Sequence, residues 1–421
     1  MDFNRDQDDD NLTSLLVVLP LAVTGFVVAA GCWTLFAVAG VHLRETMALS
    51  GVQFSLLLAM PMATGAMLAV PAGLAAQYLG ARRVMIACLA GLAACMVLVL
   101  NAETFWGYLV ASSGLGLAAG FYSAGLQFVA SHSSDRHLGL ALGVFGAGVT
   151  GAGLSYYLIP LLHRAFSWQG VPLAYLTVLL LVLVLMVLLT DEGDAGRPGS
   201  NDPPTPLLDR LRSIRMWQLC LYFGLVAGSF FALALWLPDY LTSRFELTTR
   251  DGASLAQWFV IPGALAQIAG GGLSDRFGTG RVMVRALGFC LIALFVLSYP
   301  PMTLLVQGVE KTIEVEFVLP LVLERIFVVL LGIALGCAMG GIQRMLVAEN
   351  RDGAAFAAGL LLVIACSVAF LLPLLFGAVN QWLGVRSAVF MILFPLFAGC
   401  LFLFARSQRR SERQALLHTG V

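Results

Sequence analysis

The chain has 421 residues, of which 59% are hydrophobic and only 11% are charged. Soluble domains carry roughly 25% charged residues, so this composition excludes an ordinary soluble domain. The 24 Lys and Arg residues balance the 24 Asp and Glu residues, which argues against a surface for nucleic acid. The eight cysteines are scattered singly without a CxxC pair, so the sequence predicts no metal site, no disulfide framework and no cofactor.

Twelve apolar stretches of membrane-spanning length follow one another along the chain. About 20 apolar residues cross the roughly 30 Å of hydrocarbon in a bilayer, and a backbone in lipid has to form helices or closed barrels. The first six spans are predicted at 15–40, 52–76, 83–101, 105–129, 138–163 and 170–189. The second six are predicted at 216–241, 253–275, 282–300, 317–347, 354–379 and 387–407. The sequence therefore predicts an all-α membrane protein with twelve transmembrane helices in two six-helix bundles.

A polar segment rich in Pro and Gly separates the two sets of spans and is typical of a linker. The predicted organisation is a cytoplasmic tail at 1–14, a bundle at 15–189, a linker at 190–215, a bundle at 216–407 and a cytoplasmic tail at 408–421. Placing the N-terminus in the cytoplasm puts 17 of the 24 Lys and Arg residues on that side. The acidic N-terminal residues lack the basic start of a signal peptide. We therefore expect an integral protein of a bacterial inner membrane with both termini cytoplasmic.

The two halves contain an internal repeat. The segment GAMLAVPAGLAAQYLGARRVMI, from Gly65, aligns without gaps with GALAQIAGGGLSDRFGTGRVMV, from Gly263. The alignment pairs Gly73 with Gly271, and each copy ends one helix and leads through a short basic turn into the next. Parallel repeats of this kind place the substrate site near the bilayer midplane, between the halves.

The second copy resembles the signature loop of the major facilitator superfamily. The resemblance implies that an Asp in this loop, here Asp275, pairs with basic residues across the domain boundary. The first copy has Gln77 at the equivalent position, so we expect a weaker latch there. The predicted gating and loop residues of the two copies are Gly271, Asp275, Arg276, Arg281, Gly73 and Arg83.

Several longer stretches resemble the nitrate/nitrite porters of that superfamily. They include LALGVFGAGVTGAG at 140–153, LALWLPDYL at 233–241 and FLLPLLFGAVNQWLGVRSAVFM at 370–391. The resemblance implies a secondary transporter for a small molecule or an inorganic ion. The first stretch is rich in glycines, which allow either tight helix packing or a sliding contact. These predicted packing glycines are Gly143, Gly146, Gly148, Gly151 and Gly153.

The same resemblance implies that nitrate or nitrite is held between two arginines, one in the second helix of each half. This chain has Ala69 and Gln267 at those positions, which the internal repeat also pairs. An anion that leaves water loses hydration worth several kcal/mol, for which arginines would compensate with charge and paired donors. We therefore expect an uncharged central cavity. Its candidate lining residues are Gln267, Ala69, Tyr122, Thr150, Ser155 and Trp236.

Two classes of function remain open at this point. The first is a secondary transporter that moves a small solute by alternating access of its two bundles. The second is a non-transporting relative that acts as a sensor or as a partner in a membrane complex. An enzyme is not predicted, because no His, Asp and Glu cluster has metal-ligand spacing. Glu324, near the outer end of its span, is a candidate proton-coupling group, but the sequence names no coupling ion and no protein partner.

Overall fold

The computed structural model describes residues 3–190, 211–247, 249–300, 302–307, 312–317, 319–383 and 387–419. Most of the predicted linker at 190–215 lies outside these residues. The helices of the N-terminal half are α1 (Phe3–Trp33), α2 (Leu35–Thr46), α3 (Gly51–Leu79), α4 (Ala81–Asn101), α5 (Phe105–Gly114), α6 (Leu117–Ser131), α7 (Leu138–Gly146), η1 (Ala147–Val149) and α8 (Thr150–Leu189). The elements of the C-terminal half are α10 (Ile214–Arg244), α11 (Thr249–Phe277), α12 (Thr279–Leu297), β1 (Met302–Gln307), β2 (Thr312–Phe317), α13 (Leu321–Glu349), η3 (Arg351–Gly353), α14 (Ala354–Leu383) and α15 (Ala388–Thr419).

Among the described residues, nine helical segments are long and apolar enough to cross a membrane. The segment Leu138–Leu189 accounts for two crossings, because its helical dihedrals break at Phe166 and Ser167 and the chain turns back. Two further predicted spans correspond to the shorter apolar stretch Val17–Trp33 and to α11. The helices therefore account for all twelve predicted spans.

Three predicted boundaries differ from the structure. The span predicted at 317–347 begins too early, because α13 starts at Leu321 and residues 312–317 form β2, which pairs antiparallel with β1. The sequence TIEVEF alternates polar and apolar residues, which is strand periodicity. At the chain ends, α1 begins at Phe3 and α15 continues to Thr419, so both segments predicted as tails are largely helical. The C-terminal tail contains Arg, Glu and Gln residues, which are good helix formers.

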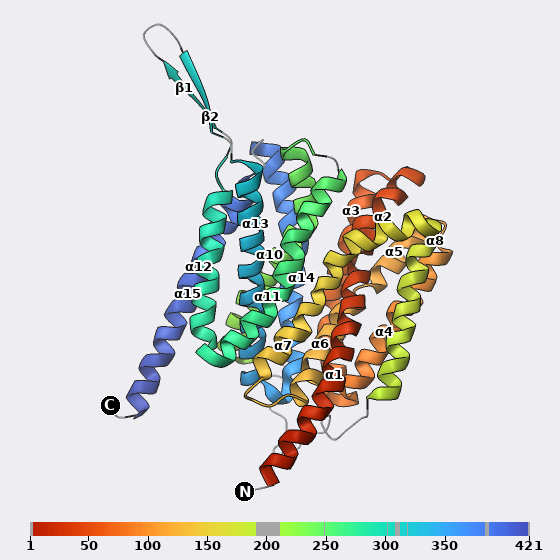
Figure 1. Cartoon of the computed structure of the whole chain (residues 1–421), viewed down its shortest axis with the longest axis vertical. Helices are drawn as coiled ribbons and strands as arrows, with labels where there is room; N and C mark the ends of the chain where they lie inside the picture. Colours follow the sequence, from red (N-terminus) through yellow and green to blue (C-terminus); the bar gives the residue numbers. More distant parts are fainter. Residues whose placement is uncertain are drawn as a thin grey trace.

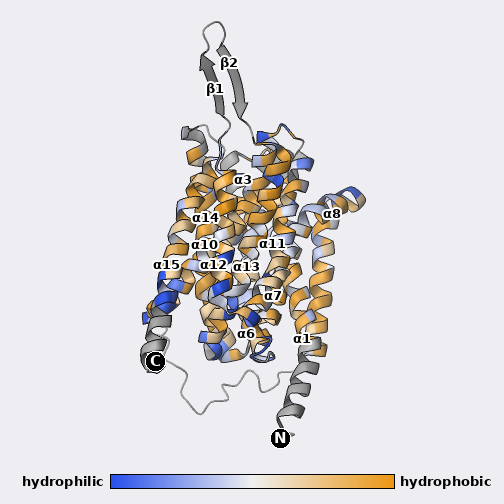
Figure 2. Cartoon of the chain, turned by 60° about the vertical axis from the view of Figure 1, so that its left-hand side comes forward, coloured by the Kyte–Doolittle hydropathy of each residue, from blue (hydrophilic) through white to orange (hydrophobic). Residues whose placement is uncertain are grey.

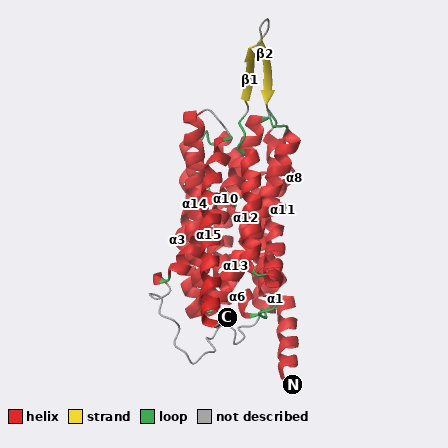
Figure 3. Ribbon diagram, turned by 90° about the vertical axis from the view of Figure 1, so that its left-hand side faces the viewer, coloured by secondary structure: helices red, strands yellow, loops and turns green. Residues whose placement is uncertain are grey.

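The helices run side by side along the long axis of the molecule (Figures 1 and 3). Both termini lie at one end, which we call the terminal end, and the β1–β2 hairpin extends from the opposite, hairpin end (Figure 1). The two halves meet along two extensive contacts between helices. In one, α3 packs on α14; in the other, α7 packs on α11. We call these contacts the α3–α14 seam and the α7–α11 seam.

Hydrophobic residues predominate along most of the length of the bundle (Figure 2). Exposed large side chains include those of Leu188, Phe295 and Trp382. A soluble monomer rarely exposes apolar patches of this extent. The surface therefore matches a lipid-facing exterior, as the composition predicts.

Candidate functional site

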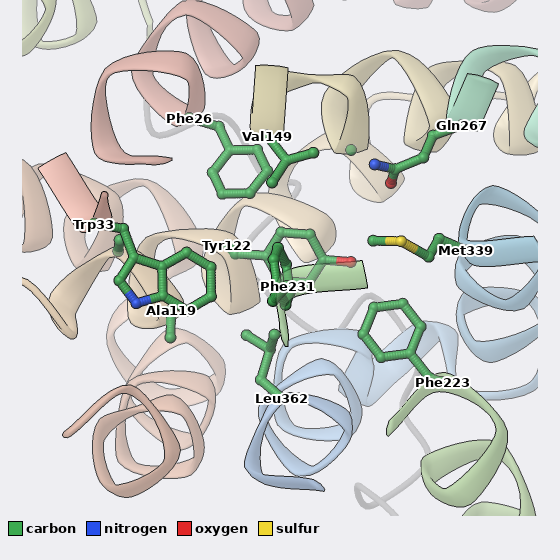
Figure 4. A pocket seen from close by; sticks show the side chains of 12 residues that line it. Phe26, Trp33, Ala119, Tyr122, Val149, Phe223, Phe231, Gln267, Met339 and Leu362 are labelled. Atoms are coloured by element: carbon green, nitrogen blue, oxygen red, sulfur yellow. The ribbon is translucent and has the colours of Figure 1, made fainter. Parts of the chain in front are cut away.

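A cavity lies between the two halves, and the unfilled space in and around it amounts to about 330 Å³. Helices α1, α6 and α7 line it from the N-terminal half, and α10, α11, α13 and α14 line it from the C-terminal half (Figure 4). The twelve lining residues are Phe26, Trp33, Ala118, Ala119, Tyr122, Gly146, Val149, Phe223, Phe231, Gln267, Met339 and Leu362. None of these twelve is charged, and five are aromatic. The lining of this cavity is thus uncharged.

Two of the cavity residues belong to a hydrogen-bond chain that joins the halves. The side-chain nitrogen Nε2 of Gln343, on α13, donates to the Tyr122 hydroxyl at 2.7 Å and to Oε1 of Gln267 at 3.0 Å. Tyr122 is on α6, so this chain crosses from one half to the other. All three side chains are buried. We call Tyr122, Gln343 and Gln267 the amide bridge.

The amide bridge leaves two buried polar atoms without a partner among the described residues. They are Nε2 of Gln267 and Oε1 of Gln343. Exchanging nitrogen and oxygen in both amides would reverse which residue offers the donor, but one NH₂ group and one carbonyl would still remain unpaired. Leaving such a group buried and unpaired costs about 1–3 kcal/mol. A bound solute that paired with both groups would recover that free energy.

Gly146 provides the space that the two amides occupy. A Cβ atom at this glycine would clash with Oε1 of Gln267 and would lie 2.8 Å from Oε1 of Gln343. Figure 4 shows the Gln267 side chain directed into the cavity, with its nitrogen on the side of Val149. Gln267 and Gly146 line the cavity, and the unpaired Oε1 of Gln343 lies next to Gly146, behind this lining.

Ala69 does not line the cavity, although the repeat pairs it with Gln267. It is fully buried in the α3–α14 seam, where a Cβ atom at Gly359 would lie 2.5 Å from its carbonyl oxygen. In the α7–α11 seam, a Cβ atom at Gly143 would meet the carbonyl oxygen of Gln267 in the same way. The two backbones are therefore equivalent, whereas only the longer Gln267 side chain reaches the cavity.

Three other predicted lining residues lie within single halves. Thr150 donates to the Ala147 carbonyl at 2.5 Å. Ser155 forms a 2.6 Å hydrogen bond with Tyr175, also on α8. Trp236 stacks on Tyr240 with ring centroids 4.6 Å apart. The structure thus brings only Gln267 and Tyr122 together out of the six predicted lining residues.

Asp275 links the halves at the terminal end. Its carboxylate accepts hydrogen bonds from the backbone N–H groups of Gly139 at 3.0 Å and Leu140 at 2.8 Å, at the start of α7. It also forms an ion pair with Arg344 at 2.5 Å. Arg344 belongs to the same half as Asp275, so the expected basic partner across the boundary is replaced by a helix N-terminus. A carboxylate is favourable at that position because it caps free N–H groups and complements the helix dipole.

The other predicted loop residues have more limited contacts. Gly271 and Gly139 approach closely, because a Cβ atom at Gly271 would clash with the Gly139 carbonyl. Gly73 is the equivalent glycine of the α3–α14 seam, where a Cβ atom would clash with the Ala355 carbonyl. Arg276 lies over the ring of its neighbour Phe277, 5.4 Å from the centroid. Arg83 and Arg281 are exposed near the starts of α4 and α12.

The glycines of α7, η1 and α8 divide into two groups. Gly143, Gly146 and Gly153 face α11 of the other half, where Gly153 meets Val260 and Ile261. Gly148 and Gly151 instead face α1 of their own half, against Phe26 and Val27. Only the first group can belong to a contact that changes when the halves move.

The sequence analysis did not single out Gln343, although this residue lies inside both the span predicted at 317–347 and α13. The signal that it offered was a polar amide within an apolar span.

Glu324 has an unexpected partner at the hairpin end. It is buried, forms an ion pair with Arg244 of α10 at 3.1 Å and accepts a hydrogen bond from the Tyr240 hydroxyl at 2.5 Å. The spacing of Tyr240 and Arg244, four residues apart on one helix face, was the available signal.

Comparisons with known proteins agree with this architecture. Residues 21–347 match the family model of the Major Facilitator Superfamily. The chain is a major facilitator transporter. It is 30% identical over 396 residues to a probable nitrate/nitrite antiporter of Thermus thermophilus, covering 91% of this chain and 89% of the relative. It is also 24% identical over 298 residues to a nitrite extrusion protein of Bacillus subtilis, covering 71% and 73%.

Solved transporter structures share the fold. A major facilitator transporter, FucP, in its outward conformation superposes with a TM-score of 0.72 at 16% identity, covering 93% of this chain and 99% of the other. A human organic anion transporter superposes with a TM-score of 0.70 at 17% identity and the same coverage. The protein is therefore a secondary transporter related to the nitrate/nitrite porters, and not an enzyme.

Proposed function

We propose that this transporter carries a small uncharged solute, or an anion that it holds only weakly, through the cavity between its halves. The observation that supports the proposal is the uncharged lining, with Gln267 where the resemblance to nitrate/nitrite porters implies an arginine. An anion in this cavity would lose hydration worth several kcal/mol without a compensating cation. An uncharged solute avoids that cost.

The proposed transport cycle is alternating access of the bundles 15–189 and 216–407, joined by the linker 190–215. The α3–α14 and α7–α11 seams would open and close during this cycle, and the amide bridge would break and re-form with them. By the distribution of Lys and Arg, the terminal end faces the cytoplasm. The proposed location is a bacterial inner membrane.

The test is transport by proteoliposomes that contain the native chain or Gln267→Arg. We expect the native chain to show no saturable nitrate uptake at micromolar concentration. The relatives of the chain suggest nitrate as the solute, but the uncharged lining of its cavity does not. The variant adds a cation beside Gln343 and should acquire nitrate uptake at least tenfold above the native rate. A tenfold change corresponds to about 1.4 kcal/mol of interaction free energy.

A matched control is Gln257→Arg, which places the same charge on the same helix but outside the cavity lining. It should not acquire nitrate uptake. Saturable nitrate uptake by the native chain at micromolar concentration would disprove the uncharged-solute proposal. If neither protein carries any solute, the non-transporting alternative is supported.

A further inference from the structure

The unpaired groups of the amide bridge define what a solute has to offer. One amide NH₂ and one amide carbonyl, on Gln267 and Gln343, lack partners among the described residues, whichever way the two amides are assigned. A solute that satisfies both must carry one acceptor and one donor. Nitrate carries acceptors only, so its oxygens would face the unpaired carbonyl without a compensating hydrogen bond.

The rest of the cavity limits the size and polarity of the solute. The remaining wall is apolar or aromatic apart from the Tyr122 hydroxyl, which the amide bridge already engages. The unfilled space of about 330 Å³ includes open surroundings, so the enclosed part of the cavity is smaller than this. It suits a solute of a few heavy atoms with little polar surface beyond one hydrogen-bonding group.

We propose that the cavity recognises a small uncharged solute in which a carbonyl-type oxygen and an N–H or O–H share one planar group. A small primary amide has this group, and so does the protonated form of a small oxygen acid. The solute accepts from the free NH₂ and donates to the free carbonyl, so both unpaired atoms gain partners at once. The proposal rests on the uncharged-solute function above and names its solute class.

The decisive experiment measures [¹⁴C]acetamide uptake into proteoliposomes containing the full chain, corrected for protein-free liposomes. We expect saturable uptake that unlabelled formamide inhibits and nitrate does not. Gln267→Met and Gln343→Met remove the hydrogen-bonding groups at similar side-chain length and should each lower the saturable rate at least tenfold. Gln257→Met makes the same change outside the cavity lining and should stay within twofold of native.

A second arm tests the acid form with [¹⁴C]formate between pH 7 and pH 5. If the protonated acid is carried, the protein-dependent rate should rise roughly tenfold per pH unit, as the protonated fraction does. Either arm supports the proposal, and together they separate amides from acids. The competition measurements use the native chain and so do not depend on how well the variants fold.

Two outcomes would overturn the proposal. Uptake of acetamide and formate that is equal in the native chain and the Gln343→Met variant would show that the amide bridge does not select the solute. Nitrate uptake by Gln267→Arg, with neither probe carried by the native chain, would leave the transport scaffold standing and reject this solute class. If no solute is carried by any of these proteins, the proposed function fails as well.

Discussion

The two seams between the halves use the same backbone contact with different side chains. In the α3–α14 seam, Ala69 and Gly73 face Gly359 and Ala355, and all four are small and apolar. In the α7–α11 seam, the positions equivalent to Ala69 and Gly73 are Gln267 and Gly271, which face Gly143 and Gly139. A polar side chain therefore lies in the α7–α11 seam, whereas the equivalent positions of the α3–α14 seam carry only small apolar residues.

The two seams are expected to differ most in the loss of stability caused by substituting Asp275 or its counterpart Gln77. Asp275→Ala would remove two helix-capping hydrogen bonds and the partner of Arg344, so we expect a loss of about 2–3 kcal/mol in the free energy of unfolding. Gln77→Ala should cost only a few tenths of a kcal/mol. Thermal unfolding of the purified variants measures both. Equal shifts in Tm would contradict the asymmetry.

Gly143→Ala and Gly359→Ala test whether the backbone contacts are equivalent. Each added methyl would press on the carbonyl of residue 267 or 69, so each variant should lose about 1–3 kcal/mol of stability. Only Gly143→Ala displaces the backbone that carries Gln267. Uptake competition should therefore show altered solute preference for Gly143→Ala, and reduced rate with unchanged preference for Gly359→Ala. A change of preference in both would mean that the α3–α14 seam also shapes the cavity.

The smallest effect is expected for the exposed pair of Asp135 and Arg351, which also joins the halves at the terminal end. The Asp135 side chain is 81% exposed, and exposed ion pairs contribute only about 0–1 kcal/mol. Asp135→Ala should change Tm less than Asp275→Ala and should leave the uptake rate within about twofold. A larger Tm shift for Asp135→Ala than for Asp275→Ala would contradict this ranking.

The sequence predicts the helices and the place of Gln267 well, because both depend on features that recur. Span length follows from apolar runs, and the repeat between Gly65 and Gly263 places Gln267 on the helix that borders the cavity. The repeat also pairs Ala69 with Gln267, but backbone equivalence does not determine how far a side chain reaches. Ala69 is therefore in a seam and not in the cavity.

The sequence could not predict the direction in which each side chain points from its helix. Lipid-spanning helices are apolar nearly all round, so no hydrophobic stripe marks the inward face. Ser155 and Trp236 are polar or amphipathic residues in such helices, and they turn toward partners in their own halves. Gln343 has no matching signal in the repeat, and only its contacts with Tyr122 and Gln267 reveal it.

The uncharged cavity also has an electrical consequence. Moving one elementary charge across the bilayer changes its free energy by about 2.3 kcal/mol for each 100 mV of membrane potential. When the halves rock around an uncharged solute held by amides and aromatic rings, no charge at the cavity moves through that field. Under the proposed function, the voltage across the membrane would neither drive nor oppose the movement of the uncharged solute itself.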